Sequence, residues 1–106
     1  MKLVLASTSR YRRELLARLQ VPFSVADPGV EEQARPGEDP RDLSRRLAED
    51  KARAVGLREP GALIIGCDQV AVADGNIIGK PGNRDNAVRQ LLALSGRDVL
   101  FHTALC

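Results

Sequence analysis

Arginines and serines gather just after the first apolar run of the chain. Arg10, Arg12 and Arg13 directly follow the triplet Ser7-Thr8-Ser9. At the start of a helix, free N–H groups, hydroxyls and guanidinium groups suit the oxygens of a phosphate. The same residues could equally form a helix cap and a solvated basic face. The pattern alone therefore leaves phosphate binding and a structural role about evenly balanced.

Two acidic positions could supply a proton acceptor or a cation site. Asp68 follows the apolar run 62–65, and we expect it where that strand ends, the place where open α/β sheets hold catalytic groups. A turn residue that satisfies backbone donors is the commoner role for such an aspartate. Glu31 and Glu32 stand together in an irregular segment, where a carboxylate could share a divalent cation with a triphosphate, although solvated loop charge is the default.

The two lysines of interest differ in what their surroundings indicate. Lys80 lies in Gly79-Lys80-Pro81-Gly82, whose glycines would let the backbone approach a ligand closely. This segment is not a P-loop, because Gly-Lys is not followed by Ser or Thr. Lys51 falls within a predicted helix, opposite much of its apolar stripe, and is expected at the surface. We expect a buried thiol at Cys67, because the only histidine, His102, belongs to a different predicted strand.

The elements that must position these residues alternate along the chain. Helical spacing follows Ser9, extends from Asp39 to Gly56, and returns between Asn83 and Gly96. Asp74-Gly75 predicts a tight hairpin turn, and the unpatterned segment 27–39 predicts a surface loop. Apolar runs predict strands over 3–6, 23–26, 62–65, 70–73, 77–78 and 99–105, with 62–65 buried on both faces. This order predicts one α/β domain over residues 1–106, a mixed twisted sheet with flanking helices.

Composition narrows the class of protein. The chain has 106 residues, 43% of them hydrophobic and 28% charged, as in one globular domain. A net charge of +2 and an aromatic content of 3% do not predict a nucleic-acid partner. The N-terminal apolar run is too short for a signal peptide or a membrane span. The short run also leads us to expect no membrane partner. Two cysteines form no disulfide framework, so we expect a reducing, cytoplasmic location.

Several of these segments, in their order and spacing, resemble the Maf family of nucleoside triphosphate pyrophosphatases. The matching segments are Leu5–Leu16, Val30–Glu32, Ala48–Ala52, Ile64–Val70, Gly79–Pro81 and Leu94–Gly96. The resemblance implies a Maf/ITPase-like fold and hydrolysis of a nucleoside triphosphate to the monophosphate and pyrophosphate. It also implies a divalent cation as cofactor, magnesium with manganese as the alternative.

The resemblance assigns expected roles to five basic or polar residues around the triphosphate. Ser7, Arg12 and Arg13 match residues that bind the triphosphate, and Lys51 and Lys80 match lysines that neutralise the phosphates. Such groups would offset the charge of a nucleotide and of the developing transition state.

Four further residues receive roles from the resemblance. Glu32 matches the glutamate on the metal side, and Asp68 matches a metal-binding aspartate that accepts a proton from the attacking water. Tyr11 and Gln69 resemble residues of the subgroup that acts on 7-methyl-GTP. A base-reading Gln69 is chemically sensible because an amide both donates and accepts hydrogen bonds, but it could equally bond to neighbouring strands.

The chain departs from the family in two ways. Arg10 stands where the family commonly has proline, and family members continue beyond residue 106. We therefore expect the N-terminal part of the fold, with the C-terminal portion missing. Two hypotheses follow: a pyrophosphatase acting on modified nucleotides, or a truncated product that binds a nucleotide or a protein partner without turnover. The resemblance also allows a homodimer.

Overall fold

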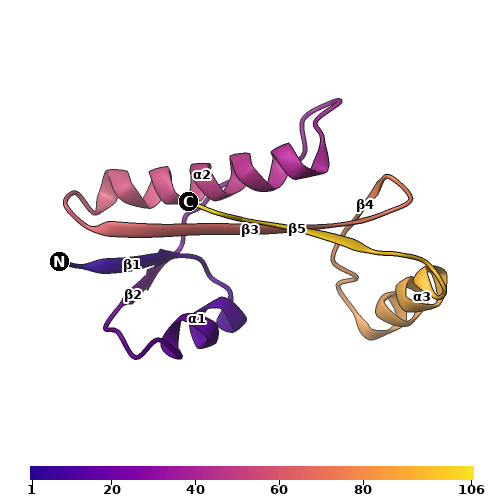
Figure 1. Cartoon of the computed structure of the whole chain (residues 1–106), viewed down its shortest axis with the longest axis horizontal. Helices are drawn as coiled ribbons and strands as arrows, with labels where there is room; N and C mark the ends of the chain where they lie inside the picture. The colour runs from indigo at the N-terminus through magenta and orange to yellow at the C-terminus, as the bar shows by residue number, and fades with distance from the viewer.

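The predicted alternation of strands and helices is present in the computed structural model, which describes all 106 residues (Figure 1). Serine, aspartate and asparagine begin the three helices as N-caps, because Ser9, Asp39 and Asn83 each accept a hydrogen bond from a backbone N–H of the first turn. The elements are β1 (Leu3–Ala6), α1 (Arg10–Ala17), β2 (Ser24–Ala26), α2 (Pro40–Arg58), β3 (Leu63–Ala73), β4 (Asn76–Ile78), α3 (Arg84–Leu94) and β5 (Leu100–Leu105).

The five strands form one mixed sheet in the order β2-β1-β3-β4, with β5 paired to β3. Strand β1 runs parallel to both β2 and β3, whereas β4 and β5 run antiparallel to β3. The predicted hairpin is confirmed: Ala73 pairs with Asn76, and Asp74 and Gly75 both have positive φ, at 51° and 77°. This is the form of a two-residue type I′ turn. The fold class expected from the sequence is therefore confirmed.

Strand β3 is longer than predicted, and this changes the setting of Asp68. The sequence predicts two strands interrupted at Gly66-Cys67-Asp68, but β3 is one strand of 11 residues. It continues because β5 supports it along the opposite edge: β1 pairs with β3 only as far as Gly66, and β5 pairs with the other edge from Cys67 onward. The prediction that Asp68 ends a strand is wrong. Asp68 nevertheless lies two positions beyond the last parallel pair, near the carboxyl end of β1.

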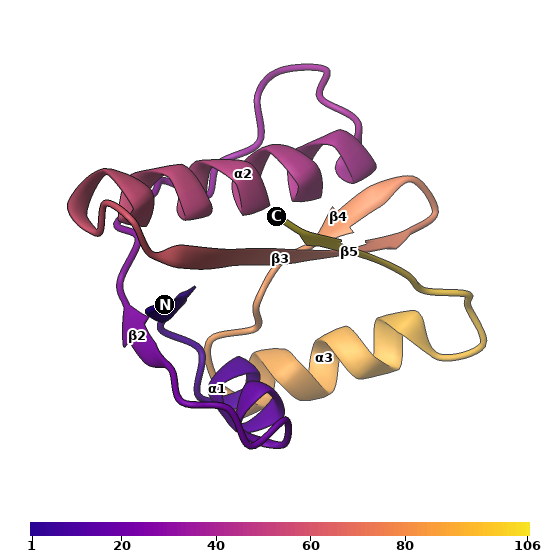
Figure 2. The ribbon, with the colours of Figure 1, turned by 60° about the vertical axis from the view of Figure 1, so that its left-hand side comes forward.

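Helix α2 covers one side of the sheet, and α1 and α3 lie on the other side (Figures 1 and 2). The two buried apolar clusters both include residues of α2. They are Leu43, Leu47, Val70 and Val72, and Val4, Ala6 and Val55. Neither α1 nor α3 contains a buried residue. The expectation that 62–65 is buried on both faces is therefore wrong: Leu63 is 55% exposed. None of the three helices has the length and apolar character needed to cross a bilayer.

Candidate active site

The start of α1 is built by the two serines that follow β1. Ser7 is buried, and its Oγ accepts a hydrogen bond from the Ser9 backbone N–H at 3.0 Å. Ser9 Oγ in turn accepts from the Arg12 backbone N–H at 3.3 Å. The Arg12 side chain turns back to the sheet, where Nη1 donates to the Cys67 carbonyl oxygen at 3.0 Å. The helix start is thereby fixed against the middle of β3.

Lys51 is buried, with only 4% of its surface exposed, so the expectation of a surface lysine is wrong. It follows Leu47 by four residues and precedes Val55 by four, and both of these residues are buried. Residues four apart lie on the same helix face, so Lys51 belongs to the stripe that packs on the sheet.

Lys51 joins two carboxylates from distant parts of the chain. Its Nζ donates to Asp68 Oδ1 at 3.0 Å and lies 2.5 Å from Glu32 Oε1. The hydrogen bond from Lys51 is the largest cause that lowers the pKa of Glu32, and the positive charges of Lys80 and Arg12 add to it against the opposing effect of partial burial. The three residues form a cluster, called here the Lys51 cluster, of one ammonium and two carboxylates.

Gly66 allows α2 to lie close enough for this cluster to form. A Cβ at Gly66 would lie 2.2 Å from the Ala48 carbonyl oxygen and 2.9 Å from Ala52 Cβ, both on α2. Glycine within a strand marks such a close approach of another backbone. Sequence reasoning missed Gly66, although an isolated glycine inside an apolar run was a signal for it.

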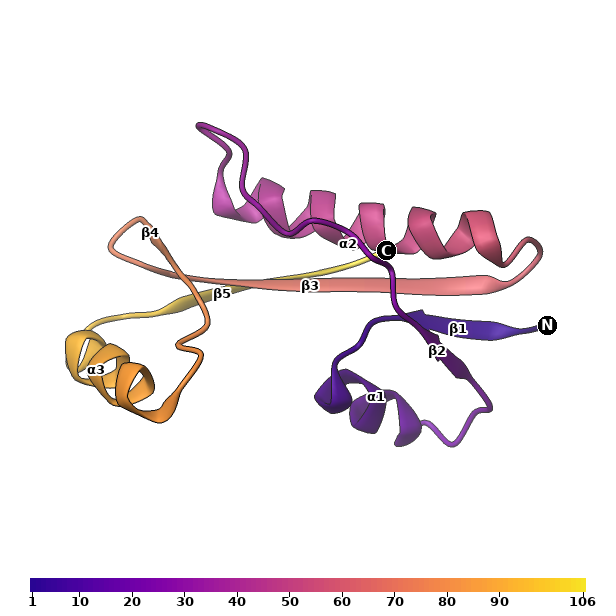
Figure 3. The same cartoon turned by 180° about the vertical axis from the view of Figure 1, so that it is seen from behind.

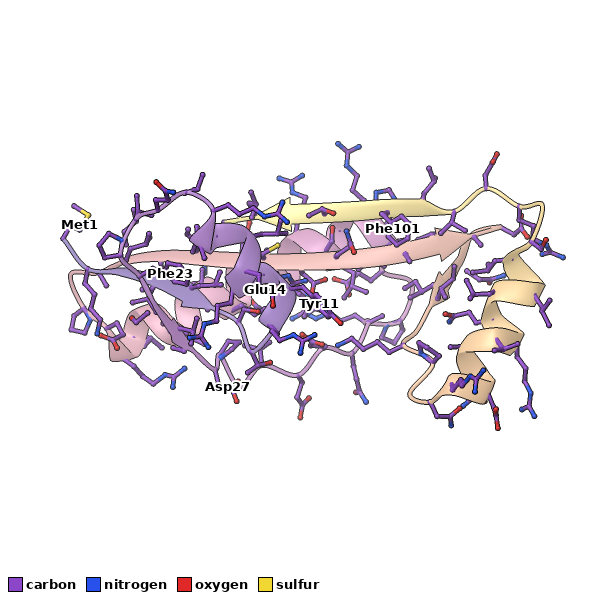
Figure 4. The ribbon with its side chains drawn as sticks, turned by 90° about the horizontal axis from the view of Figure 1, so that it is seen from below. Met1, Tyr11, Glu14, Phe23, Asp27 and Phe101 are labelled. Atoms are coloured by element: carbon purple, nitrogen blue, oxygen red, sulfur yellow. The ribbon has the colours of Figure 1, made fainter.

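Most of the predicted phosphate-binding residues border one cleft of about 610 Å³, called here the phosphate cleft. Four of its side chains are cationic and two are acidic, so a polyanion would meet an excess of positive charge. Figure 4 views the molecule from below and labels Tyr11 on α1 and Asp27 after β2, both of which border this cleft. The lining residues are Ser7, Thr8, Ser9, Arg10, Tyr11, Arg12, Asp27, Pro28, Gly29, Val30, Glu32, Lys51 and Lys80.

Asp68 and Arg13 do not border the phosphate cleft. Asp68 is buried and meets the cleft through its hydrogen bond with Lys51. Arg13 is exposed and borders a different hollow with Glu14 and Phe23, which Figure 4 also labels. Consecutive residues of a helix point about 100° apart, so Arg12 and Arg13 cannot share one direction. The structure thus brings Arg12 to the predicted site and leaves Arg13 apart from it.

The two residues that the resemblance connects with substrate specificity lie in separate hollows. Tyr11 is 69% exposed at the phosphate cleft, with the Arg10 guanidinium 5.3 Å from its ring centroid. Gln69 is exposed beside a second hollow of about 620 Å³, which Phe101 also borders. Its amide Nε2 donates to Thr103 Oγ1 at 2.9 Å. Lys80 borders both the phosphate cleft and the hollow beside Gln69, and so connects the two.

The chain offers two carboxylates for a divalent cation, those of Glu32 and Asp68. No group of three or more His, Cys, Asp or Glu side chains converges in the structure. Magnesium in phosphate-binding sites is commonly held by one or two carboxylates together with substrate oxygens and water. The donor set therefore fits a cation that binds with a phosphorylated ligand.

The expected buried thiol is also present, because Cys67 is only 9% exposed.

Comparison with known proteins connects this site to a family. The family model described as "Maf-like protein" matches residues 2–106. A protein from Methylobacillus flagellatus named "7-methyl-GTP pyrophosphatase" is 60% identical over 104 residues, which are 98% of this chain and 54% of that protein. A protein of the same name from Albidiferax ferrireducens is 56% identical over 98% of this chain and 52% of its own length.

The chain thus spans about half the length of the curated relatives it matches. The family match, in contrast, extends over nearly all of the chain and includes every residue of the phosphate cleft and of the Lys51 cluster. The resemblance seen in the sequence is confirmed, and the chain belongs to the Maf family.

Proposed function

We propose that this chain carries the phosphate-binding and proton-accepting residues of a nucleoside triphosphate pyrophosphatase whose substrate is 7-methyl-GTP. The observation that carries the proposal is the Lys51 cluster, in which one buried ammonium holds Glu32 and Asp68 beside a cationic cleft. The names of the Methylobacillus flagellatus and Albidiferax ferrireducens relatives support the substrate.

In this proposal the phosphate cleft holds the triphosphate. The Ser7 hydroxyl and the Arg12 guanidinium, at the start of α1, bind phosphate oxygens, and the Lys80 ammonium binds them from the segment after β4. The triphosphate also attracts Lys51, whose ammonium exchanges Asp68 for a phosphate oxygen. This exchange frees the Asp68 carboxylate, which in the present structure meets the cleft only through Lys51.

Asp68 then acts as the general base. The oxygen of a water molecule forms a bond to the α-phosphorus, and one proton of that water passes to Asp68. The bond from the α-phosphorus to the oxygen bridging to the β-phosphorus breaks, and pyrophosphate leaves with the electron pair. Glu32 and Asp68 are the residues that would hold a divalent cation, which would supply positive charge at the phosphate oxygens.

The second hollow is the proposed place of the base. Lys80 borders both hollows, so a nucleotide with its phosphates in the cleft would extend past Lys80 toward Gln69 and Phe101. The Gln69 amide is already oriented by Thr103 and so presents its remaining hydrogen-bonding atoms to a ligand. The exposed ring of Phe101 offers an apolar face, which suits stacking by a positively charged methylated purine.

A second candidate, nucleotide binding without turnover, is favoured by one observation: the Asp68 carboxylate is paired with Lys51 and does not itself border the phosphate cleft. The two are separated by measuring, with magnesium, both equilibrium binding and pyrophosphate release for 7-methyl-GTP, GTP, dTTP and UTP. Binding with release, and with preference for 7-methyl-GTP, supports the pyrophosphatase. Binding without release from a folded sample supports the second candidate, and no binding contradicts both.

A further inference from the structure

Glu32 lies in the long segment 27–39, which contains no helix or strand between β2 and α2. Figure 3 shows this segment crossing from β2 and running along α2 to the start of that helix. A segment of this kind does not by itself hold a carboxylate against a buried lysine, because fixing each free residue costs conformational entropy. The contacts on either side of Glu32 must therefore supply the order.

One anchor precedes Glu32. Val30, two residues earlier, is half-buried and packs against the apolar cluster formed by Leu43, Leu47, Val70 and Val72. This contact fixes the segment on the side of the phosphate cleft, since Val30 also borders that cleft.

Arg46 of α2 provides the other anchor. Its Nε donates to Glu38 Oε2 at 2.7 Å, and its Nη2 donates to Glu38 Oε1 at 2.9 Å and to the Gln33 carbonyl oxygen at 3.0 Å. Two parallel bonds between a guanidinium and a carboxylate form a strong and directional pair. Nη1 lies 3.4 Å from Asp50 Oδ2, one helical turn along α2. Arg46 thus binds the segment at Gln33, which directly follows Glu32, and again at Glu38, near the end of the segment.

The part of the segment that Arg46 grips is itself a closed turn. The Glu38 backbone N–H donates to the Arg35 carbonyl oxygen at 3.0 Å, and the Arg35 N–H donates to Glu38 Oε1 at 3.0 Å. Gly37 follows Pro36 and has a φ of 72°, the positive value that the third residue of a type II turn requires. Glu38 therefore closes the turn and binds Arg46 with the same carboxylate.

We propose that Arg46 is a positioning residue, which holds residues 33–38 against α2 so that the Glu32 carboxylate faces Lys51 in the phosphate cleft. The contacts of Arg46 with Gln33 and Glu38 are called here the clamp. Arg46 and Lys51 stand five positions apart on one rigid helix, so the position of the clamp relative to Lys51 is fixed. Arg46 does not border the cleft and acts through the segment that it holds. The functional consequence, a correctly placed Glu32, rests on the proposed function.

The clamp itself is tested by amide hydrogen exchange in the 106-residue chain without nucleotide. Arg46→Ala should raise exchange at the Arg35 and Glu38 amides by about tenfold or more, as expected for losing a charge-assisted hydrogen bond. Arg45→Ala removes the same charge from the neighbouring exposed residue and should leave these amides unchanged. Arg46→Lys keeps the charge without the planar fork and should restore only part of the protection.

Amides of β3 show whether each variant is folded. If Arg46→Ala does not fold, Glu38→Ala removes the same contact from the side of the segment and should also raise exchange at Arg35. Exchange at Arg35 that is unchanged in every folded variant would overturn the clamp.

The action of Arg46 through Glu32 is tested by a double-mutant cycle on nucleotide binding. The ligand is a GTP analogue with a methylene bridge between the α- and β-phosphates, titrated with and without magnesium. If Arg46 acts through Glu32, then adding Arg46→Ala to Glu32→Gln should cause no further loss of the magnesium-dependent affinity. Additive losses would overturn this role.

A third result concerns the proposed function alone. If Glu32→Gln leaves the magnesium-dependent affinity unchanged, the metal role proposed for Glu32 fails and, with it, the consequence claimed for Arg46. The amide exchange at Arg35 would still decide whether the clamp exists.

Discussion

Lys51 of α2 and Asp68 of β3 form a buried ion pair, with Nζ donating to Oδ1 at 3.0 Å and the two side chains 6% and 8% exposed. The same ammonium binds Glu32 from the segment before α2. One lysine therefore pairs with carboxylates from two separate parts of the chain, and the arrangement of this site depends on that lysine.

Replacing Lys51 with methionine should destabilise the fold. The substitution leaves the Asp68 carboxylate buried without its partner, a change that costs about 3–5 kcal/mol. Urea denaturation should show this loss in the free energy of unfolding. Arg53→Met, at an exposed position of the same helix, is the control and should change it by less than about 0.5 kcal/mol. Equal losses in the two variants would contradict the ion pair.

Replacing Gly66 with alanine should separate α2 from β3. The added Cβ would lie 2.2 Å from the Ala48 carbonyl oxygen, so the helix must shift, at a cost of about 1–3 kcal/mol or more. Gly56→Ala is the matched control, because a Cβ there meets nothing within 4 Å, and alanine should stabilise the helix by up to about 1 kcal/mol. Thermal unfolding midpoints that move in the same direction for both variants would argue against the close packing at Gly66.

Much of this fold is predictable because local patterns and tertiary structure agree. The caps at Asp39 and Asn83 and the Asp74-Gly75 turn lie where the sequence places them, and Ser9 is the cap of the two candidates, Thr8 and Ser9, that the sequence offers for the first helix. The length of β3 is not predictable from local pattern, because beyond Gly66 the strand no longer pairs with β1 and is held by β5 along its opposite edge. The pairing with β5 depends on a strand more than thirty residues away in the chain.

The site is predictable in its members more than in its arrangement. Ser7, Arg12, Glu32 and Lys80, to which the resemblance assigns roles around a triphosphate, border one cleft. The main feature that the prediction misses is the burial of Lys51, because a lysine without a partner is usually a surface residue and the partners of Lys51 come from other parts of the chain. The 47-51-55 spacing nevertheless carried that information.

Arg12 and Arg13 provide a direct test of which face of α1 binds phosphate. Arg12 borders the cleft, whereas Arg13 borders the hollow on another side of the helix. Arg12→Ala should weaken triphosphate binding by about tenfold or more, since one charge-assisted hydrogen bond is lost, and Arg13→Ala should weaken it much less. Isothermal titration with 7-methyl-GTP measures both. A larger effect at Arg13 would show that the triphosphate lies on the other face.

The contact between Glu38 and Arg46 should survive mild acid. The hydrogen bonds from the Arg46 guanidinium and then from the Arg35 N–H lower the pKa of Glu38 from 4.5 to about 2. Because the pKa is lower in the folded chain, the stabilisation is fully present above 4.5 and is lost as the pH falls through about 2.

Thermal unfolding of the parent and of Glu38→Gln checks this dependence. The difference between their midpoints should be constant above about pH 5 and shrink toward zero at lower pH. A difference that already disappears between pH 7 and about pH 5 would contradict the lowered pKa of Glu38.

The most direct test of the proposed function compares the parent with Asp68→Asn for 7-methyl-GTP binding and for pyrophosphate release with magnesium. Asparagine keeps an oxygen that accepts from Lys51 but cannot take a proton from water, so binding should persist while release falls by about 10²–10⁴-fold. Equal rates of release in a folded parent and a folded Asp68→Asn variant would contradict the role of Asp68 as the proton acceptor.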